Sequence, residues 1–359
     1  MHIALIANAS WLDEELSQFR YLVVGLIDEQ VHVAQVLPDG IPGDEISGFA
    51  HCVSWRDSRW SLCRSFSLRR QAETLEHLGV DLFHALDVQV WGGTVALAKK
   101  LGVPAVLSTS CASDLSQVDR LRRAVEDRRL AFSAATDPLA RAIADKIGDD
   151  SVVRVIPPGV HVPKAPITET LEDRPLCAVI SGSGQADAEY ESLFEAMRSV
   201  IAAHPQTQFF MDNQGSDPHT LWRMADRYGV LSNTSIVPRR LGHRELLLRA
   251  GVLIHPQPLG RARSLTLQAM AAGIPVIARL DPWLDYLLEN HTAWLVEEAD
   301  PRRWEQLILR LLVNRDAGRQ LGLRARQWVS EHHVAAQQVA ATLQFYQRQT
   351  GESLKFPGT

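Results

Sequence analysis

One segment, HPQPLGRARSLTLQAMAAGIPVIA over residues 255–278, constrains the fold of this chain more than any other. It predicts a strand that ends at His255, a loop, a helix over Ser264–Ala272, a turn and a second strand over Val276–Ala278. Gly273 and Pro275 favour a turn between helix and strand, because neither residue continues a helix well. The order strand, helix, strand is typical of parallel α/β sheets.

The same alternation runs along the whole chain. Short apolar runs, typical of parallel strands buried on both faces, alternate with helical patterns. The predicted strands are Ile3–Ala7, Val31–Leu37, Leu82–Ala85, Ala105–Ser108, Leu130–Ala134, Val152–Ile156, Leu176–Ile180, Gln208–Met211, Ser235–Val237, Val252–His255 and Val276–Ala278. The predicted helices are Glu14–Asp28, Leu68–Leu78 with Ser67 as its N-cap, Gly93–Leu101, Glu189–His204, Pro218–Tyr228, Arg244–Ala250 and Ser264–Ala272, with an amphipathic helical tail over Arg324–Arg348. A linker over Pro163–Pro175 separates two blocks, which predicts two doubly wound domains with a cleft between them.

Composition narrows the classes of function. The chain has 359 residues, an apolar fraction of 46% and a net charge of −5, which fits two globular domains and argues against nucleic acid as a partner. Its four cysteines show no metal-ligand spacing, so we expect a reducing compartment, the cytoplasm. The first residues, MHIALIANASW, predict a strand and not a signal peptide, and no apolar run is long enough to span a membrane.

Several motifs together carry a resemblance to a known family. Ala269-Met270-Ala271 and the run from Gly273 to Ile277 are similar to the donor-site segment of the retaining group 1 (family-4-like) glycosyltransferases of the GT-B fold. Four further segments resemble other motifs of that family: Gly79–Ala85, Val155–Val160, Val237–Leu246 and Glu298–Pro301. The resemblance implies two facing Rossmann-like domains with parallel sheets, and a C-terminal helix that crosses back to the first domain. We therefore expect a first domain over 1–163, completed by about 333–359, and a second over 170–332.

The positions that carry chemistry in that family differ in this chain. The resemblance implies two glutamates in the donor segment, but Gly260 and Gln268 stand there. It implies a Gly-Gly loop after the first strand, where our register places Glu14-Glu15, and a histidine where Cys111 stands. It also implies an arginine and a lysine that hold the donor diphosphate, whereas the segment from Ser181 to Glu189 contains no cation. Two lost charge-assisted hydrogen bonds weaken binding by about 10²–10⁴-fold.

Other residues of the second domain are candidates for replacing them. Arg261 and Arg263 precede the helix at Ser264, whose N-terminus attracts anions, and Arg239-Arg240 ends another predicted strand. Gln268 retains the hydrogen-bonding capacity to bind ribose hydroxyls. No catalytic residue is assigned. The candidate substrate-binding residues are Ser181, Gly182, Arg239, Gly260, Arg261, Arg263, Ser264, Leu265 and Gln268.

Three further patterns leave alternatives open. Gly182-Ser183-Gly184, with Asp212 after the next strand, is similar to a nicotinamide-nucleotide fingerprint, but Asp187 stands in place of its third glycine. Residues 55–70, WRDSRWSLCRSFSLRR, indicate either a basic face that contacts a membrane or an acidic acceptor, or an ordinary surface helix. The histidines at 161, 243, 332 and 333 show no metal or triad pattern, so structural or exposed roles are favoured.

Two classes of function follow from these residues. The first is a glycosyltransferase that moves a sugar from a nucleotide-sugar donor, with retention, to a glycan or small-molecule acceptor that the sequence does not identify. The second is a catalytically inactive relative, a pseudo-glycosyltransferase, that acts as a binding or partner protein. The differences at the site argue against catalytic turnover more than against membership of the family, because fold does not determine function. We expect neither a metal nor another cofactor in either case.

Overall fold

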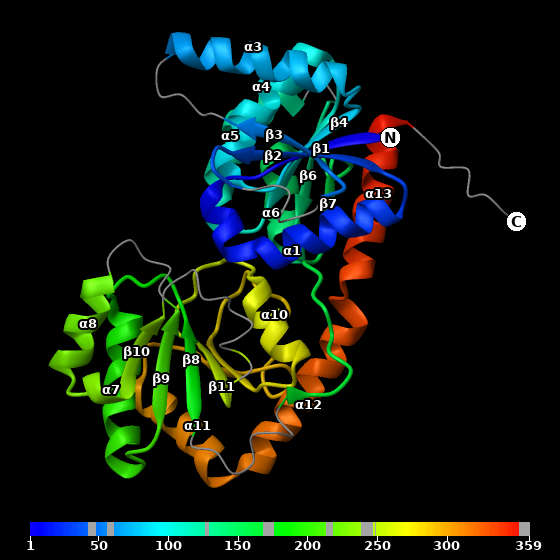
Figure 1. Ribbon diagram of the computed structural model, residues 1–359. Coiled ribbons are helices and arrows are strands. Elements are labelled where there is room, and N and C mark those ends of the chain that lie inside the picture. The colour runs from blue at the N-terminus through cyan, green and yellow to red at the C-terminus, as the bar shows by residue number, and fades with distance from the viewer. Residues whose placement is uncertain are drawn as a thin grey trace, which may run out of the picture. The chain divides into compact units, whose positions relative to one another are not determined.

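The computed structural model describes residues 1–41, 48–55, 61–125, 129–167, 176–212, 218–237, 247 and 249–351 (Figure 1). The chain forms two compact units. Unit 1 consists of Met1–Gly159 and Ala335–Thr359, and unit 2 of Val160–Val334. Each unit has its own parallel sheet and its own apolar core. Among the described residues, no helix is both long and apolar enough to cross a membrane.

Unit 1 is built on a sheet of seven parallel strands in the order β3-β2-β1-β4-β5-β6-β7. Their bounds are β1 His2–Ile6, β2 His32–Pro38, β3 His51–Trp55, β4 Leu82–Ala85, β5 Ala105–Thr109, β6 Leu130–Ala134 and β7 Val153–Val155. The central strands are largely apolar and buried because both faces of the sheet are covered. The helices are α1 Ala9–Asp28, α3 Ser61–His77, α4 Trp91–Leu101, α5 Leu115–Val125, α6 Asp137–Ile147 and α13 Ala335–Thr350, with short 3₁₀ turns at Val88–Val90 and Ala112–Asp114.

The connection after β1 differs from the prediction. Asn8 caps α1, its side-chain oxygen accepting the Trp11 amide, so the helix begins at Ala9. Glu14 and Glu15 therefore lie inside α1 and not in a loop. Glu15 is buried, and its backbone angles depart from those of a helix. The prediction that Glu14-Glu15 occupy a loop after the first strand was wrong, because Asn8 is a good N-cap and the helix begins directly after it.

Helix α13 belongs to unit 1, where it packs on α1 and contacts β4. A buried chain of hydrogen bonds fixes it to the sheet. His84 Nδ1 lies 2.5 Å from the Tyr346 hydroxyl, and His84 Nε2 lies 2.7 Å from Ser108 Oγ, which in turn contacts Ser133 Oγ at 2.8 Å. Burial lowers the pKa of His84 to about 3 and raises the pKa of Tyr346, so the whole chain of groups is uncharged at neutral pH.

Unit 2 is built on six parallel strands in the order β10-β9-β8-β11-β12-β13. The strands are β8 Cys177–Ser181, β9 Gln208–Asp212, β10 Thr234–Val237, β11 Val252–His255, β12 Val276–Arg279 and β13 Trp294–Val296. The helices are α7 Ala188–Ala203, α8 Pro218–Arg227, α10 Ser264–Ala271, α11 Pro301–Val313 and α12 Arg315–His332, with a 3₁₀ turn at Leu231–Asn233. The predicted helix Arg244–Ala250 lies largely outside the described residues.

The turn that contains Gly273 and Pro275 is where helix α12 packs closely against the backbone. Helix α12 lies against α10, and a Cβ placed at Gly322 would come within 1.9 Å of the Gly273 carbonyl oxygen. Only a glycine lets the α12 backbone approach the turn this closely. The neighbouring Gly318 meets only the flexible end of Leu311 at its closest contact.

Two details of the predicted helices were wrong. Helix α3 begins at Ser61, so Ser67 lies inside it and does not cap it. The tail is not one helix, because α12 ends at His332 and α13 begins at Ala335. Between them, Val160 pairs with Val334 in an isolated parallel bridge. This pairing takes the backbone out of the helical conformation where the chain passes from unit 2 to unit 1.

Acid should destabilise unit 1 through His84. Its pKa is about 3 in the folded chain against an ordinary 6.5, so stability is complete above pH 6.5 and falls as the pH drops towards 3. The fall is about 1.4 kcal/mol per pH unit, because only the unfolded chain takes up the proton. We expect His84→Gln to lower the free energy of unfolding at pH 7.5 but to flatten its decline between pH 6.5 and 4. Urea unfolding followed by circular dichroism measures both effects.

The control for this experiment is His77→Gln, which changes an exposed histidine of the same unit. It should keep the wild-type dependence of stability on pH. Equal slopes for wild type and His84→Gln would contradict the assignment of the proton to His84.

Gly322→Ala should destabilise unit 2 by about 3 kcal/mol, because a methyl group there overlaps backbone that cannot move aside. Gly318→Ala is the matched control on the same helix and should cost far less, because Leu311 can change rotamer and alanine favours a helix. Thermal and urea unfolding of the two variants provide the comparison. The idea of a backbone contact fails if the two variants are equally stable.

Candidate functional site

The candidate site lies where the order of unit-2 strands reverses. Strands β8 and β11 are neighbours at the centre of the sheet. The strand that follows β8 in sequence, β9, lies on one side of this pair, and the strand that follows β11, β12, lies on the other. In doubly wound sheets, ligands bind outside the carboxyl ends of the strands at such a switch point. The groups present here are Ser181 and Gly182 after β8, the loop of residues 256–263 after β11, and the N-terminus of α10. We call the 256–263 segment the donor loop, because the resemblance implied that it would face a donor substrate.

Arg263 brings a cation to the loop after β8. It is the N-cap residue of α10, and its side chain is only 3% exposed. Its Nη1 donates to Ser181 Oγ at 3.2 Å and to the Gly182 carbonyl at 3.4 Å. The segment from Ser181 to Glu189 contains no cation of its own, so the charge reaches it from a distant part of the chain.

His255 lies beside this arginine at the end of β11. Its Nδ1 donates to the Ser181 carbonyl at 2.8 Å, which leaves Nε2 as the acceptor of a neutral ring. Burial, followed by the positive charge of Arg263, lowers the pKa of His255 to about 4. Its Nε2 is buried and has no hydrogen-bond partner within the described part of the chain. His255 was not among the residues predicted from the sequence, although a histidine that ends a fully apolar strand was a usable signal.

Asp281 holds the donor loop in place and was also missed from the sequence. Gly260 adopts a φ of +60°, and its amide donates to Asp281 Oδ2 at 2.7 Å. Asp281 Oδ1 accepts the Trp283 amide at 3.0 Å. Burial raises the pKa of the Asp281 carboxyl, while the two amides and the charge of Arg279 act in the opposite direction. A carboxylate thus contacts the backbone of Gly260, the position at which the resemblance implied a glutamate.

The N-terminus of α10 presents backbone donors beside Arg263. Ser264 and Leu265 form its buried first turn, which contains no acidic residue. Gln268 lies one turn further on, half-buried, and its Nε2 donates to Ser264 Oγ at 3.3 Å. Backbone amides at a helix start, together with a guanidinium, favour an anion.

The loop after β8 is closed by other side chains. Gln257 Oε1 accepts the Ser183 amide at 2.7 Å, and Gln257 Nε2 donates to Asp187 Oδ2 at 2.5 Å. Asp187 Oδ1 caps α7 by accepting the Tyr190 amide at 3.0 Å. Arg279, at the end of β12, pairs with Glu189 at 2.7 Å and donates to the Val296 carbonyl.

The remaining predicted residues are placed as follows. Ser181, Gly182, Gly260, Arg263, Ser264, Leu265 and Gln268 gather at the carboxyl edge of the unit-2 sheet, and Arg261 is half-buried in the donor loop. Arg239 lies outside the described residues, as does His243. Cys111 caps a 3₁₀ turn of unit 1, and His332 and His333 pack against the ring of Trp328.

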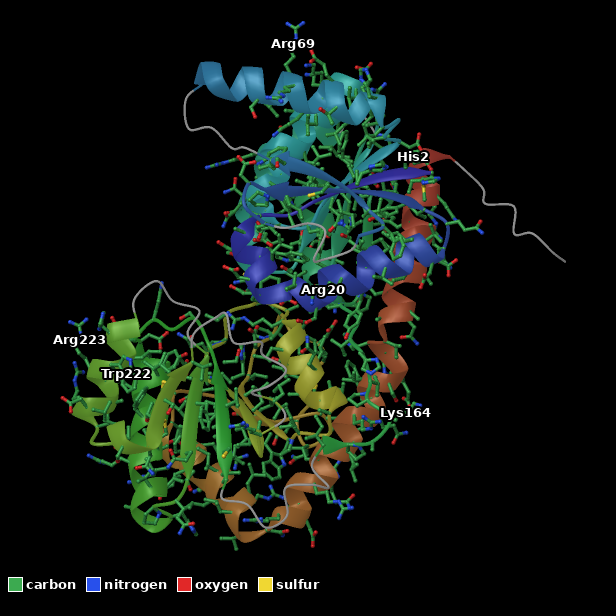
Figure 2. The ribbon with its side chains drawn as sticks, viewed as in Figure 1. His2, Arg20, Arg69, Lys164, Trp222 and Arg223 are labelled. Carbon is green, nitrogen blue, oxygen red and sulfur yellow. The ribbon has the colours of Figure 1, made fainter. Side chains whose placement is uncertain are left out.

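The basic segment 55–70 is only partly described. Trp55 is buried and packs over Gly93, so it is not an exposed aromatic. Arg69 projects from α3 (Figure 2) and pairs with Glu73 at 3.1 Å. The side chains of residues 56–66 lie outside the described part, and with them most of the predicted face.

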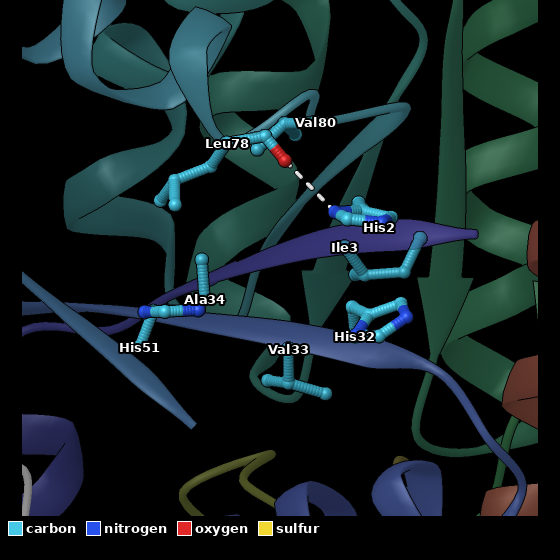
Figure 3. Close-up of a pocket in the computed structure, with 8 residues that line it drawn as sticks. All are labelled: His2, Ile3, His32, Val33, Ala34, His51, Leu78 and Val80. Atoms are coloured by element: carbon cyan, nitrogen blue, oxygen red, sulfur yellow. Dashed lines mark hydrogen bonds between the residues drawn. The ribbon is translucent and has the colours of Figure 1, made fainter. Parts of the chain in front are cut away.

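Two cavities lie away from the switch point. A cavity of about 60 Å³ adjoins His2, His32 and His51, near the amino ends of β1, β2 and β3 (Figure 3). Within it, His2 Nδ1 donates to the Leu78 carbonyl. A larger one, of about 530 Å³ at the end of β13, is lined by four acidic residues, three apolar residues and Arg303, and its excess of carboxylates suits phosphate poorly. Within the described residues, no three His, Cys, Asp or Glu side chains are grouped to hold a metal ion.

A family model matches nearly half of the chain. The family model described as "Glycosyl transferases group 1" matches residues 167–328, a range that falls within unit 2. The match supports a group 1 glycosyltransferase and covers every described residue of the candidate site. Among curated proteins, none matches the chain.

Solved structures show the fold of the whole chain. A glycosyltransferase from Rickettsia africae superposes with a TM-score of 0.76 at 12% identity, covering 98% of this chain and 99% of the other. The Anabaena protein Alr3699/HepE, in complex with UDP-glucose, gives 0.77 at 13% identity, with 98% and 100% covered. Sucrose-phosphate synthase from Thermosynechococcus elongatus gives 0.71 at 17%, with 98% and 100% covered. The predicted GT-B fold, with two Rossmann-like parallel-sheet units, is confirmed.

Asp281→Ala should reduce the free energy of unfolding of unit 2 by about 2–4 kcal/mol, because two amides lose a buried acceptor. Asp281→Asn keeps one acceptor oxygen and should lie between wild type and Asp281→Ala. Asp226→Ala, at an exposed carboxylate, is the control and should change stability little. Urea unfolding and limited proteolysis of the donor loop test this. If Asp281→Ala keeps the wild-type free energy of unfolding and the wild-type resistance of the donor loop to protease, the loop does not depend on Asp281.

Proposed function

We propose that this chain is a glycosyltransferase that binds a nucleotide sugar at the unit-2 switch point and transfers the sugar with retention. The observation that carries the proposal is Arg263. A buried guanidinium at the carboxyl end of β8, next to a helix N-terminus, provides charge for a diphosphate leaving group. UDP-glucose, the ligand of the Anabaena protein, is the first donor to test.

In this proposal each group has a defined part. Arg263 and the amides of Ser264 and Leu265 meet the phosphate oxygens. Gln268 offers hydrogen bonds to the ribose hydroxyls from the next turn of α10. Charge that develops on the leaving nucleotide as the glycosidic bond breaks is then stabilised through the phosphate group that Arg263 and α10 hold in position. The acceptor, a glycan or a small molecule, is not specified by these residues.

Nucleotide binding tests the proposal most directly. Titration calorimetry with UDP, ADP, GDP and their glucose esters should reveal one nucleotide that binds, with an affinity for the wild type in the micromolar range. Arg263→Gln should weaken that binding by about 10–100-fold, because it removes charge-assisted bonds. Arg263→Lys should retain part of it, and Arg303→Gln, at a partly exposed arginine paired with Glu289, should leave it unchanged. An intact fold with no binding across the panel would refute the proposal.

Retention is tested without knowledge of the acceptor. Slow hydrolysis of the donor sugar ester, followed by proton NMR before mutarotation, should release the α-anomer from an α-linked donor. Release of the β-anomer would mean inversion. The Arg263→Gln variant should release sugar more slowly than the wild type at saturating donor.

A second candidate function has its own supporting observation. Gly260 carries no side chain toward a bound sugar, and the backbone amides of Gly260 and Ser183 are already bonded to Asp281 and Gln257. This arrangement favours a pseudo-glycosyltransferase that binds its ligand without turnover. Tight nucleotide binding with no sugar release over the background rate would identify this function.

A further inference from the structure

The loop after β8 contains donors that would suit a phosphate, but they have partners within the protein. Gln257 comes from the donor loop, is 2% exposed, and its amide oxygen accepts the Ser183 amide. A Cβ at Gly182 would lie 2.4 Å from the Tyr190 hydroxyl and 2.8 Å from Gln257 Oε1, so the loop is packed closely against this side chain. An amide oxygen therefore occupies the position where a phosphate oxygen would accept a hydrogen bond.

The N-terminus of α7 is closed in a similar way. The Asp187 carboxylate accepts both the Tyr190 amide and Gln257 Nε2, and it adds a negative charge at the start of the helix. Glu189 adds another carboxylate to the first turn, where it pairs with Arg279 at 2.7 Å. A helix start that holds its own carboxylates offers little attraction to a further anion.

The N-terminus of α10 has the opposite character. Its first turn contains no acid, and the buried Arg263 precedes it. The two helices start at the same edge of the unit-2 sheet, so a nucleotide at the switch point meets one anion-attracting end and one that is already occupied.

We propose that Gln257 and Asp187 determine specificity by excluding phosphate oxygens from the loop after β8, which confines the anionic group of a nucleotide to α10 and Arg263. This inference rests on the proposed function and names the ligand class of that site. A second phosphate group gains few contacts there. The wild type should therefore bind UMP and UDP with affinities within about threefold of each other.

The test compares UMP and UDP in calorimetry with the full chain. Asp187→Asn removes the negative charge but keeps the helix cap, because asparagine caps as well as aspartate. Its single carbonyl oxygen is needed by the Tyr190 amide, so Gln257 loses its acceptor and the loop can open. We expect UDP to bind about tenfold tighter than to the wild type and UMP to change less than threefold.

Asp187→Ser, which also retains a cap, should show the same gain in the ratio of UDP to UMP affinity. Glu191→Gln is the control, since Glu191 is an exposed acid of the same turn that pairs with Arg227 at 3.5 Å. It should leave the ratio unchanged. Thermal melting checks that each variant is folded. A general structural effect of residue 187 would change the affinities for UMP and UDP by the same factor and leave their ratio unchanged.

The outcomes separate this inference from the proposed function. A wild type that binds UDP tenfold or more tightly than UMP overturns the inference alone. The same holds if Asp187→Asn and Asp187→Ser leave the ratio at its wild-type value. No binding of either nucleotide to the folded wild type or the variants overturns the proposed function and the inference with it.

Discussion

The parallel pairing of β8 with β11 is the constraint on which the candidate site depends. The two strands are far apart in sequence, and the hydrogen bond from His255 to the Ser181 carbonyl joins residues 74 positions apart. Because parallel strands end at the same edge, this pairing brings the donor loop against the loop after β8. Arg263, Gln257 and the start of α10 reach Ser181 and Ser183 only through it.

Electrostatics then divide this edge into two parts. One part has a buried guanidinium, a neutral histidine and a helix start without acids. The other has the carboxylates of Asp187 and Glu189, the latter paired with Arg279. In a largely buried setting such charges act over short distances with little screening, so the location of the charges matters more than their total number. The proposed binding of a nucleotide sugar is therefore compatible with the absence of the arginine and lysine that the resemblance implied.

Fold and site differed in how far the sequence could predict them. Most strands were predicted because continuous apolar runs between turn residues identify strands buried on both faces. The short edge strand β13 and the strand β3 were not, because their patterns are short and mixed. Ser67 was a wrong cap because α3 already begins six residues earlier, at Ser61. Arg263 was selected as a candidate, whereas Asp281, His255 and Gln257 were not, because their partners lie in other strands and loops.

Residue types and local periodicity predicted the order of the elements and the division into two α/β blocks. The family resemblance, and not periodicity, implied which acidic and basic residues are missing from the segment around α10 and after β8. The tertiary structure alone decided that a cation reaches the loop after β8, that a carboxylate contacts Gly260 and that Gln257 occupies the Ser183 amide. Each of these contacts joins segments that only the pairing of the strands brings together, so no local pattern encodes them.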